Sequence, residues 1–252
     1  MKKNIAVYTA SFGGYLKNIT PAPDNNNGVD YICFTDDSTL VAPNWQLKLA
    51  RDYFDNPIQA NRYFKILPHK VLPNHDWSLY IDANIQLLKS PLSMVLKYES
   101  NRESIYIPKH YLRSCIYDEA AAIISLKKGN FREVLRQISD YKKVGFPRTF
   151  GLTENGILLR KHSNPEVIDL MEAWFSEFNK YYSQRDQLSL PFVIWRSGKK
   201  ISYLNETARN ENEYFKYHAH PTAKHDILLL KFFFIISMNL RSICAKFIVK
   251  YL

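Results

Sequence analysis

Short apolar runs alternate with helical patterns along most of this chain, and this alternation constrains the fold more than any other feature. Trp77–Ile81 is apolar almost throughout, as expected of a parallel strand buried on both faces. The pattern predicts strands at Ile5–Thr9, Val29–Asp36, Trp45–Leu49, Trp77–Ile81, Ile105–Ile107 and Gly156–Arg160. It predicts helices at Pro57–Leu67, Pro91–Tyr98, Ile116–Lys128, Phe131–Lys143 and Gln187–Trp195, and one beginning at Pro165. Interleaved strands and helices indicate an α/β protein with a mostly parallel sheet flanked by helices.

The composition excludes several classes of protein. Hydrophobic residues make up 46% of the 252 residues, which is too many for a disordered chain. Three cysteines without a CxxC pair support neither a disulfide framework nor a thiolate zinc site. The net charge of +10 comes from basic residues spread along the chain rather than gathered in stripes with aromatics, so we expect no nucleic-acid partner.

The two ends of the chain differ. The apolar run Ile5–Thr9 is too short for a signal peptide. From Ile227 the chain becomes strongly apolar, but Lys231 interrupts the run, which is therefore short for a membrane span. We expect a globular domain at 1–222 and a basic amphipathic helix at 223–252, which contacts an anionic membrane surface through 225–252. The alternative is a last helix packed on the core.

Oxygen and imidazole ligands occur at two places. Asp82 and Asn84 directly follow Trp77–Ile81, and alternate residues of an extended chain point the same way. Such oxygens suit a hard divalent cation that bridges to phosphates, although Asp and Asn also favour ordinary turns. His218 and His220 would place two imidazoles on one side of an extended segment; they are metal ligands or structural histidines.

Other polar residues admit both a functional and a structural interpretation. Asp36 ends a predicted strand and either binds a nucleoside or stabilises a turn. Arg62 and Lys65 share one helical face and either bind a diphosphate or lie in solvent. Asp186 either takes part in chemistry or stabilises a helix start.

Several segments in order resemble one protein family. They are FTDD, NRYFKILPH, YIDANI, HYLRSCIYDEA, GLTENGILLRKHSNPEVIDLMEAWF and RDQLSLPFVIW. Together they resemble the TOD/MUCI glycosyltransferase-like domain over Ile5 to Trp195. This resemblance implies a GT-A fold similar to that of family 8 retaining glycosyltransferases. It also implies a nucleotide-sugar donor and a divalent cation, Mn²⁺ or Mg²⁺.

The resemblance also implies roles for individual residues. Asp82 and Asn84 occupy the Asp-x-Asp position that holds metal and diphosphate; the second residue is a neutral Asn, and His218 or His220 would complete the metal site. Asp186 and Gln187 resemble the Asp-Gln pair beside the transferred sugar. Asp186 would then deprotonate the acceptor hydroxyl or bind the acceptor. Alternatively, Asp186 or Gln187 would stabilise the oxocarbenium face of the sugar. The donor-binding set is Thr9, Asp36, Arg62, Lys65, Asp82 and Asn84. The family pattern also holds His110, Arg113, Glu119, Glu154 and Asn155, which contact the acceptor or support the site.

The expected function follows from this resemblance. The chain would transfer a sugar to a glycan or lipid-linked acceptor, with retention or inversion of configuration, in bacterial surface polysaccharide (capsule, O-antigen or lipopolysaccharide) biosynthesis. It would work in the cytoplasm, on the inner face of the membrane. Two alternatives are a non-catalytic sugar- or nucleotide-binding module, which the neutral Asn84 favours, and a peripheral membrane scaffold.

Overall fold

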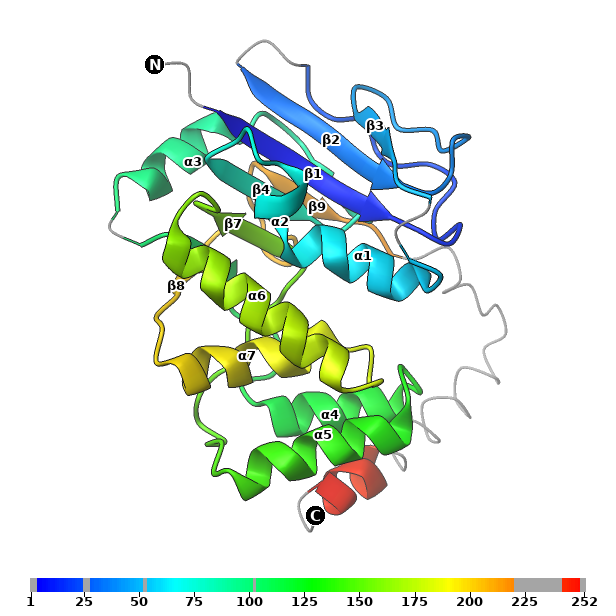
Figure 1. Ribbon diagram of the computed structural model, residues 1–252, viewed down its shortest axis with the longest axis vertical. Helices are drawn as coiled ribbons and strands as arrows, with labels where there is room; N and C mark the ends of the chain where they lie inside the picture. The colour runs from blue at the N-terminus through cyan, green and yellow to red at the C-terminus, as the bar shows by residue number, and fades with distance from the viewer. Residues whose placement is uncertain (1–3, 25–27, 52–53, 102, 220–241, 250–252) are drawn as a thin grey trace. The chain divides into compact units, whose positions relative to one another are not determined.

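The chain is seen here as a computed structural model that describes residues 4–24, 28–51, 54–101, 103–219 and 242–249. These residues form two compact units (Figure 1). The first unit comprises Met1–Pro108, Glu154–Phe175 and Lys199–His218, and the second comprises Lys109–Thr153, Ser176–Gly198 and Ala219–Leu252. We describe each unit by itself.

A seven-stranded sheet forms the centre of the first unit. Its order is β3 (Gln46–Leu49), β2 (Val29–Thr35), β1 (Ile5–Ser11), β4 (Trp77–Ile81), β7 (Ile157–Arg160), β6 (Ile105–Pro108) and β8 (Ser202–Leu204). Strand β1 pairs in parallel with β2 and β4, and so do β2 with β3 and β6 with β8. Strand β7 runs antiparallel to both of its neighbours. The predicted α/β class with a mostly parallel sheet is therefore confirmed.

Both faces of this sheet are covered, which explains why β1 and β4 are buried at every position. On one face, Phe64 of α1 (Pro57–Ile66) stacks on Phe34 of β2 and on Phe12. On the opposite face, Ile5 and Val7 of β1 share a hydrophobic cluster with α3 (Leu92–Glu99) and with the antiparallel pair β5 (Ile85–Leu87) and β9 (Phe215–Tyr217). The short helix α2 (Pro68–Val71) directly follows α1.

The second unit is helical. It contains α4 (Ile116–Ser125), α5 (Phe131–Lys143), α7 (Asp186–Ser197) and the end of α6 (Pro165–Lys180). Tyr141 of α5 stacks on Phe192 of α7 with ring centroids 3.7 Å apart, and Ser183 donates to the Gln137 side chain at 2.7 Å. A short helix at 242–249 buries Ala245 and Val249.

The structure corrects some sequence expectations. Strands β5, β8 and β9 appear where no strand was predicted. Helix α4 ends at Ser125 rather than Lys128, because Lys127 and Gly129 adopt positive φ angles. In the described ranges, no helix is long and apolar enough to cross a membrane. Of the predicted C-terminal helix at 223–252, the structure describes 242–249, which is helical. The segment 220–241, with the proposed boundary at 222/223, lies outside the described residues, so the full helix and its contact with a membrane stay predictions.

Stability is expected to fall on acidification because of His162, which is buried just after β7. Its Nε2 faces the Leu72 carbonyl at 3.1 Å, and burial lowers its pKa from 6.5 to about 4. Between these values the unfolded chain takes up a proton that the folded chain does not, so the stability present above pH 6.5 is lost as the pH falls toward 4. At about 1.4 kcal/mol per pKa unit, the loss is about 3 kcal/mol.

The measurement is urea denaturation across this pH range for the native chain and for His162→Gln. The variant keeps an N–H donor for Leu72 but does not titrate, so its stability should depend less steeply on pH. Equal slopes for the two proteins would show that His162 is not the titrating group.

Candidate active site

Asp82 stands at the carboxyl end of β4, where ligands of parallel sheets bind. Its Oδ1 lies 3.4 Å from Lys65 Nζ and accepts a hydrogen bond from the Tyr80 hydroxyl at 3.0 Å. The Asp82 side chain is 41% exposed whereas that of Lys65 is 3% exposed. A carboxylate open to solvent is therefore backed by a buried ammonium and a phenol, and the ammonium also lies 5.2 Å from the centre of the Tyr80 ring.

The Tyr80 hydroxyl donates a hydrogen bond to Asp82 and stays protonated. Burial and then the Asp82 charge hold its pKa well above the usual value, although the Arg62 guanidinium opposes them. The Tyr80 hydroxyl therefore stays protonated and continues to donate to Asp82. Arg62 stands on the same helix α1, three positions before Lys65.

A tight turn follows Asp82. The Ile85 amide donates to the Asp82 carbonyl at 2.8 Å, and the Asp82 amide donates to the Gly156 carbonyl at 2.8 Å. The expectation that 82–84 is extended, with alternate side chains pointing the same way, is wrong for this reason. A Cβ on Gly156 would lie 3.1 Å from Asp82 Oδ2, so glycine at this position gives the carboxylate room.

Arg160 fixes the end of α1 that carries Lys65. It is fully buried at the end of β7 and donates to the Lys65 and Ile66 carbonyls at 2.9 and 3.3 Å, and to the Tyr8 hydroxyl. These carbonyls belong to the last turn of α1, where helix geometry leaves them without backbone partners and a cation is favourable. Burial lowers the pKa of Arg160 and raises that of Tyr8 to about 12.

Other predicted donor-binding residues lie in the first unit. Asp36 accepts the Gly13 amide on both carboxylate oxygens, at 2.9 and 3.2 Å, so it holds the loop after β1. Arg62 donates to the side chain of its neighbour Asn61. Thr9 is buried within β1, and its hydroxyl has no hydrogen-bond partner among the described residues. Their roles toward a donor stay predictions.

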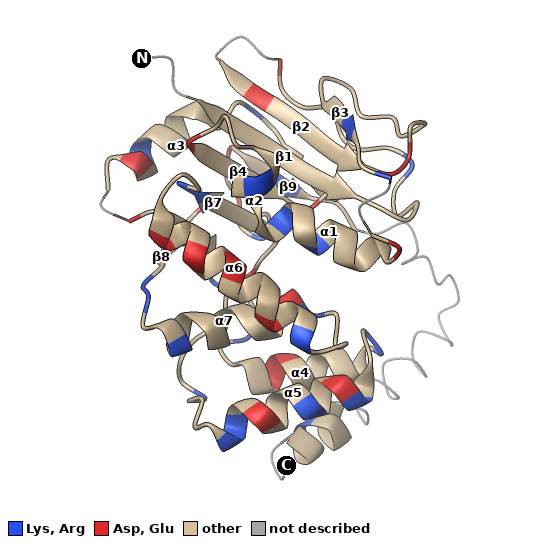
Figure 2. Cartoon of the chain, in the orientation of Figure 1, with Lys and Arg blue, Asp and Glu red and all other residues tan. Residues whose placement is uncertain are grey.

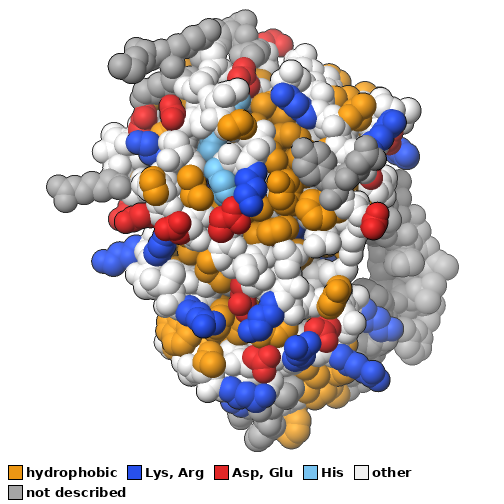
Figure 3. All heavy atoms as spheres, viewed as in Figure 1, with side chains coloured by type: hydrophobic (Ala, Val, Ile, Leu, Met, Phe, Trp, Pro, Cys, Tyr) orange, Lys and Arg blue, Asp and Glu red, His pale blue; other side chains and the backbone are white. Residues whose placement is uncertain are grey.

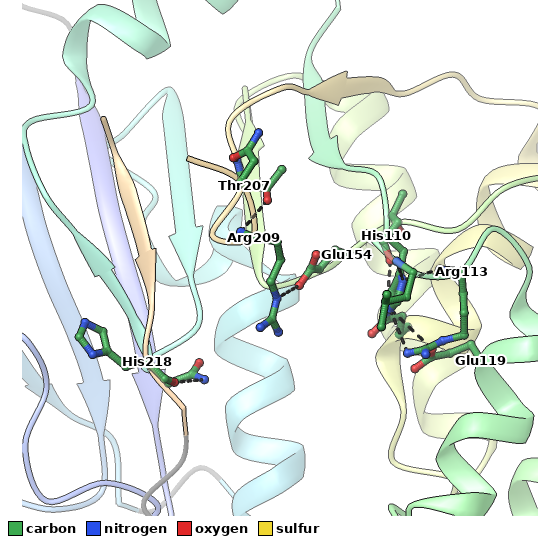
Figure 4. Close-up of polar contacts among 12 residues, drawn as sticks. His110, Arg113, Glu119, Glu154, Thr207, Arg209 and His218 are labelled. Carbon is green, nitrogen blue, oxygen red and sulfur yellow. Dashed lines mark hydrogen bonds and ion pairs between the residues drawn. The ribbon is translucent and has the colours of Figure 1, made fainter. Parts of the chain in front are cut away.

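Glu154 and Asn155 precede β7 in the same unit. Glu154 Oε1 accepts from Arg209 Nε at 2.9 Å (Figure 4). The Arg209 guanidinium lies over the Tyr217 ring, 3.6 Å from its centre. Asn155 is buried. Glu154 therefore ties the chain before β7 to the segment before β9, and its predicted place near an acceptor is untested.

Two of the predicted metal ligands, Asn84 and His218, are joined by two hydrogen bonds, both of which involve the backbone of His218. The Asn84 side chain donates to the His218 carbonyl at 3.2 Å, and the His218 amide donates to the Asn84 carbonyl at 3.0 Å. The His218 ring contacts the Gln86 side chain, Nε2 to Oε1 at 2.9 Å. Figure 4 shows that ring beside β9. His220 lies outside the described residues.

His110, Arg113 and Glu119 form a compact cluster in the second unit (Figure 4). Arg113 Nε donates to Glu119 Oε2 at 2.5 Å. His110 Nδ1 accepts the Leu112 and Arg113 amides at 3.1 and 3.0 Å, and the other ring nitrogen, Nε2, lies 3.2 Å from Arg113 Nη2. That nitrogen lies 3.7 Å from Glu119 Oε2. The three residues therefore contact one another, and their expected place at an acceptor stays a prediction.

Asp186 and Gln187 begin α7 in the second unit. Asp186 is buried in the first helical turn, where a carboxylate is favourable. Gln187 Nε2 donates to the Thr153 carbonyl at 3.1 Å. Their predicted catalytic roles stay predictions. The candidate residues therefore fall into two groups, one in each unit.

The sequence pattern assigns no role to Tyr80, Tyr8 or Arg160, which build the surroundings of Asp82. One signal exists for Arg160: a charged residue ends a strand that is otherwise apolar, and a buried charge must find polar partners. Tyr8 and Tyr80 carry no such signal, because tyrosines are common in strands.

A family comparison identifies the type of domain. A sequence model described as "TOD1/MUCI70, glycosyltransferase-like domain" matches residues 34–219. The chain belongs to this family. The match spans Asp82, the His110 cluster and Asp186-Gln187.

Two curated relatives come from Arabidopsis thaliana. The "Probable hexosyltransferase MUCI70" is 28% identical over 149 residues, which are 55% of this chain and 25% of the relative. The "Alkaline ceramidase TOD1" is 25% identical over 158 residues, which are 59% of this chain and 34% of the relative. The chain thus matches only a quarter to a third of the length of these relatives.

Two solved structures of glycosyltransferases are also similar. The WbbM bifunctional enzyme in its apo form has a TM-score of 0.47 and 13% identity, covering 81% of this chain and 39% of that chain. The GlyE glycosyltransferase of Streptococcus pneumoniae has a TM-score of 0.44 and 10% identity, covering 81% of this chain and 46% of that chain.

Proposed function

We propose that this chain transfers a hexose from a nucleotide-sugar donor to a glycan or lipid-linked acceptor. The observation that carries the proposal is the half-exposed Asp82 carboxylate, backed by Lys65 and Tyr80 at the carboxyl end of a parallel strand. Membership of a glycosyltransferase-like family and the relative named as a probable hexosyltransferase support this choice of reaction.

The chemistry of the leaving group explains the arrangement around Asp82. Cleavage of the sugar–phosphate bond develops negative charge on the diphosphate, which fixed positive groups stabilise. Lys65 supplies such a charge and is held by the anchored end of α1. Arg62, one helical turn earlier, supplies a second charge close enough to influence Tyr80.

Asp82 and Asn84 could bind a divalent cation only together with the nucleotide-sugar donor, whose phosphates would supply the remaining ligands. Asp82 provides one carboxylate and Asn84 a neutral amide oxygen, and the described part of the chain holds no cluster of three His, Cys, Asp or Glu side chains. Hard cations commonly take their remaining ligands from substrate phosphates and water. When bound, the cation would neutralise the leaving diphosphate.

Asp186 and Gln187 are proposed to act at the sugar. Asp186 either deprotonates the acceptor hydroxyl or binds the acceptor, and either residue can stabilise the oxocarbenium face. Their likeness to the Asp-Gln pair of family 8 enzymes favours transfer with retention. The apolar, basic sequence from Ile227 supports a lipid-linked acceptor and work at the inner face of a bacterial cytoplasmic membrane, in surface polysaccharide assembly.

The first test is a panel of nucleotide sugars, with and without Mn²⁺, measured by thermal shift and by release of free nucleotide. Mn²⁺ alone should shift the unfolding temperature little, because the described residues hold no cluster of three His, Cys, Asp or Glu side chains. A donor at 100 times its dissociation constant should stabilise the chain by about 2.7 kcal/mol. The same donor concentration without the metal should stabilise the chain less, because the donor then binds more weakly. Release of nucleotide should then accelerate with a suitable acceptor.

The other possible results would favour other functions. Binding of a donor without any turnover would favour the sugar-binding module. Failure to bind any donor would overturn the proposal and favour the scaffold. Ceramide is included as a substrate because one relative is named an alkaline ceramidase; release of fatty acid from it would favour amide hydrolysis over transfer.

A further inference from the structure

The turn between α4 and α5 projects an unusual set of side chains into solvent. Residues 126–132 are exposed without interruption. Among them, Leu126 is 42% and Phe131 is 47% exposed, and Lys127, Lys128 and Arg132 stand beside them. Single exposed apolar residues are ordinary, but apolar side chains gathered on one surface and rimmed by charged residues are typical of an interaction site.

The backbone of this turn is well defined. The Lys127 and Lys128 amides donate to the Ile124 and Ile123 carbonyls at 3.1 and 2.9 Å, which closes the end of α4. The Asn130 side chain accepts from the Arg132 and Glu133 amides at 3.0 and 3.3 Å, which caps α5. The exposed residues are therefore presented from fixed positions.

A third apolar side chain lies next to this turn. Tyr182 is 74% exposed, and its amide donates to Glu133 Oε2 at 3.3 Å. A Cβ on Gly129 would lie 2.5 Å from the Ser183 carbonyl oxygen, so the two loops touch. We call Leu126, Lys127, Lys128, Phe131, Arg132 and Tyr182 the turn surface.

The charge of this surface is strongly positive. In the segment 126–136, Lys127, Lys128, Arg132 and Arg136 face a single acidic residue, Glu133. That carboxylate is already engaged by Arg136 at 3.5 Å and by the Tyr182 amide. Figure 2 shows Lys and Arg along α5 with Asp and Glu between them, and Figure 3 shows basic, acidic and hydrophobic side chains intermixed on the face in view.

We infer that the turn surface binds the headgroup region of an anionic phospholipid membrane. Phe131, Tyr182 and Leu126 enter the interface, where aromatic and aliphatic side chains are favourable. Lys127, Lys128 and Arg132 contact lipid phosphates, and their aliphatic stems cover the apolar side chains. None of these residues belongs to the segment 225–252.

The test is co-sedimentation of the full chain with phosphatidylcholine vesicles that do or do not contain phosphatidylglycerol. The native chain should bind the anionic vesicles, bind neutral vesicles far less, and be released by salt. A charge variant, K127Q/K128Q/R132Q, should bind at least about tenfold more weakly. An apolar variant, L126S/F131S/Y182S, should also bind more weakly. The binding that remains should still be released by salt.

The control is K142Q/K143Q/V144S at the other end of α5, where exposed residues of the same kinds occur. It should bind as the native chain does. All replaced side chains are exposed, so equal unfolding temperatures verify folding. The inference is overturned if the native chain does not bind anionic vesicles, if both turn variants bind normally, or if the control loses as much binding as they do.

Discussion

Asp82→Asn is expected to lower the rate of donor cleavage by about 10²–10³-fold, the scale of losing one group that stabilises a developing charge, because the neutral amide would hold the cation that neutralises the leaving diphosphate more weakly. The amide keeps the shape of the side chain and an oxygen for the Tyr80 hydroxyl but removes the negative charge. Lys65, which is 3% exposed, then loses its carboxylate partner at 3.4 Å. The rate is measured as nucleotide release at saturating donor and Mn²⁺.

The matched control is Asp169→Asn, in which the carboxylate is 76% exposed and faces Lys199 at 3.5 Å. This exposed pair should contribute little to stability, and the variant should retain full activity. The unfolding temperature of both variants is measured in parallel, so that a loss of rate is assigned only to folded protein. A fully active Asp82→Asn would exclude Asp82 from the reaction.

Arg160→Leu is expected to destabilise the fold by about 1–3 kcal/mol, because the Ile66 carbonyl loses its Arg160 donor and a buried polar group left without a partner costs about that much. The variant removes donors to the Ile66 carbonyl and the Tyr8 hydroxyl, and one of the donors to the Lys65 carbonyl. The Lys65 carbonyl keeps the Tyr8 hydroxyl at 2.8 Å. The measurement is the free energy of unfolding in urea.

Arg196→Leu is the control, because Arg196 is an exposed residue in the last turn of α7. Surface substitutions of this kind change stability by about 0.5 kcal/mol. Arg160→Lys should recover part of the lost stability, since one ammonium can serve some of the acceptors. Equal stability of Arg160→Leu and the native chain would show that the buried guanidinium does not anchor the end of α1.

Local signals were sufficient for some elements. Strand β4 and helix α5 have the predicted bounds to the residue, because an apolar run defines the strand and Gly129-Asn130 defines the start of the helix. The antiparallel direction of β7 and the short strands β5, β8 and β9 have no such signals. A three-residue strand exists only because a partner strand lies beside it.

The sequence by itself determined the fold class, the family, and the position of Asp82 after a buried strand. Only the tertiary structure showed that the segment after Asp82 is a turn and that Lys65 is buried behind its carboxylate. It alone showed that Arg160, 95 positions from Lys65, donates to its carbonyl. The physical reason is that hydrophobic periodicity is local in the chain, whereas the partners of buried polar groups are set by which strands and helices pack together.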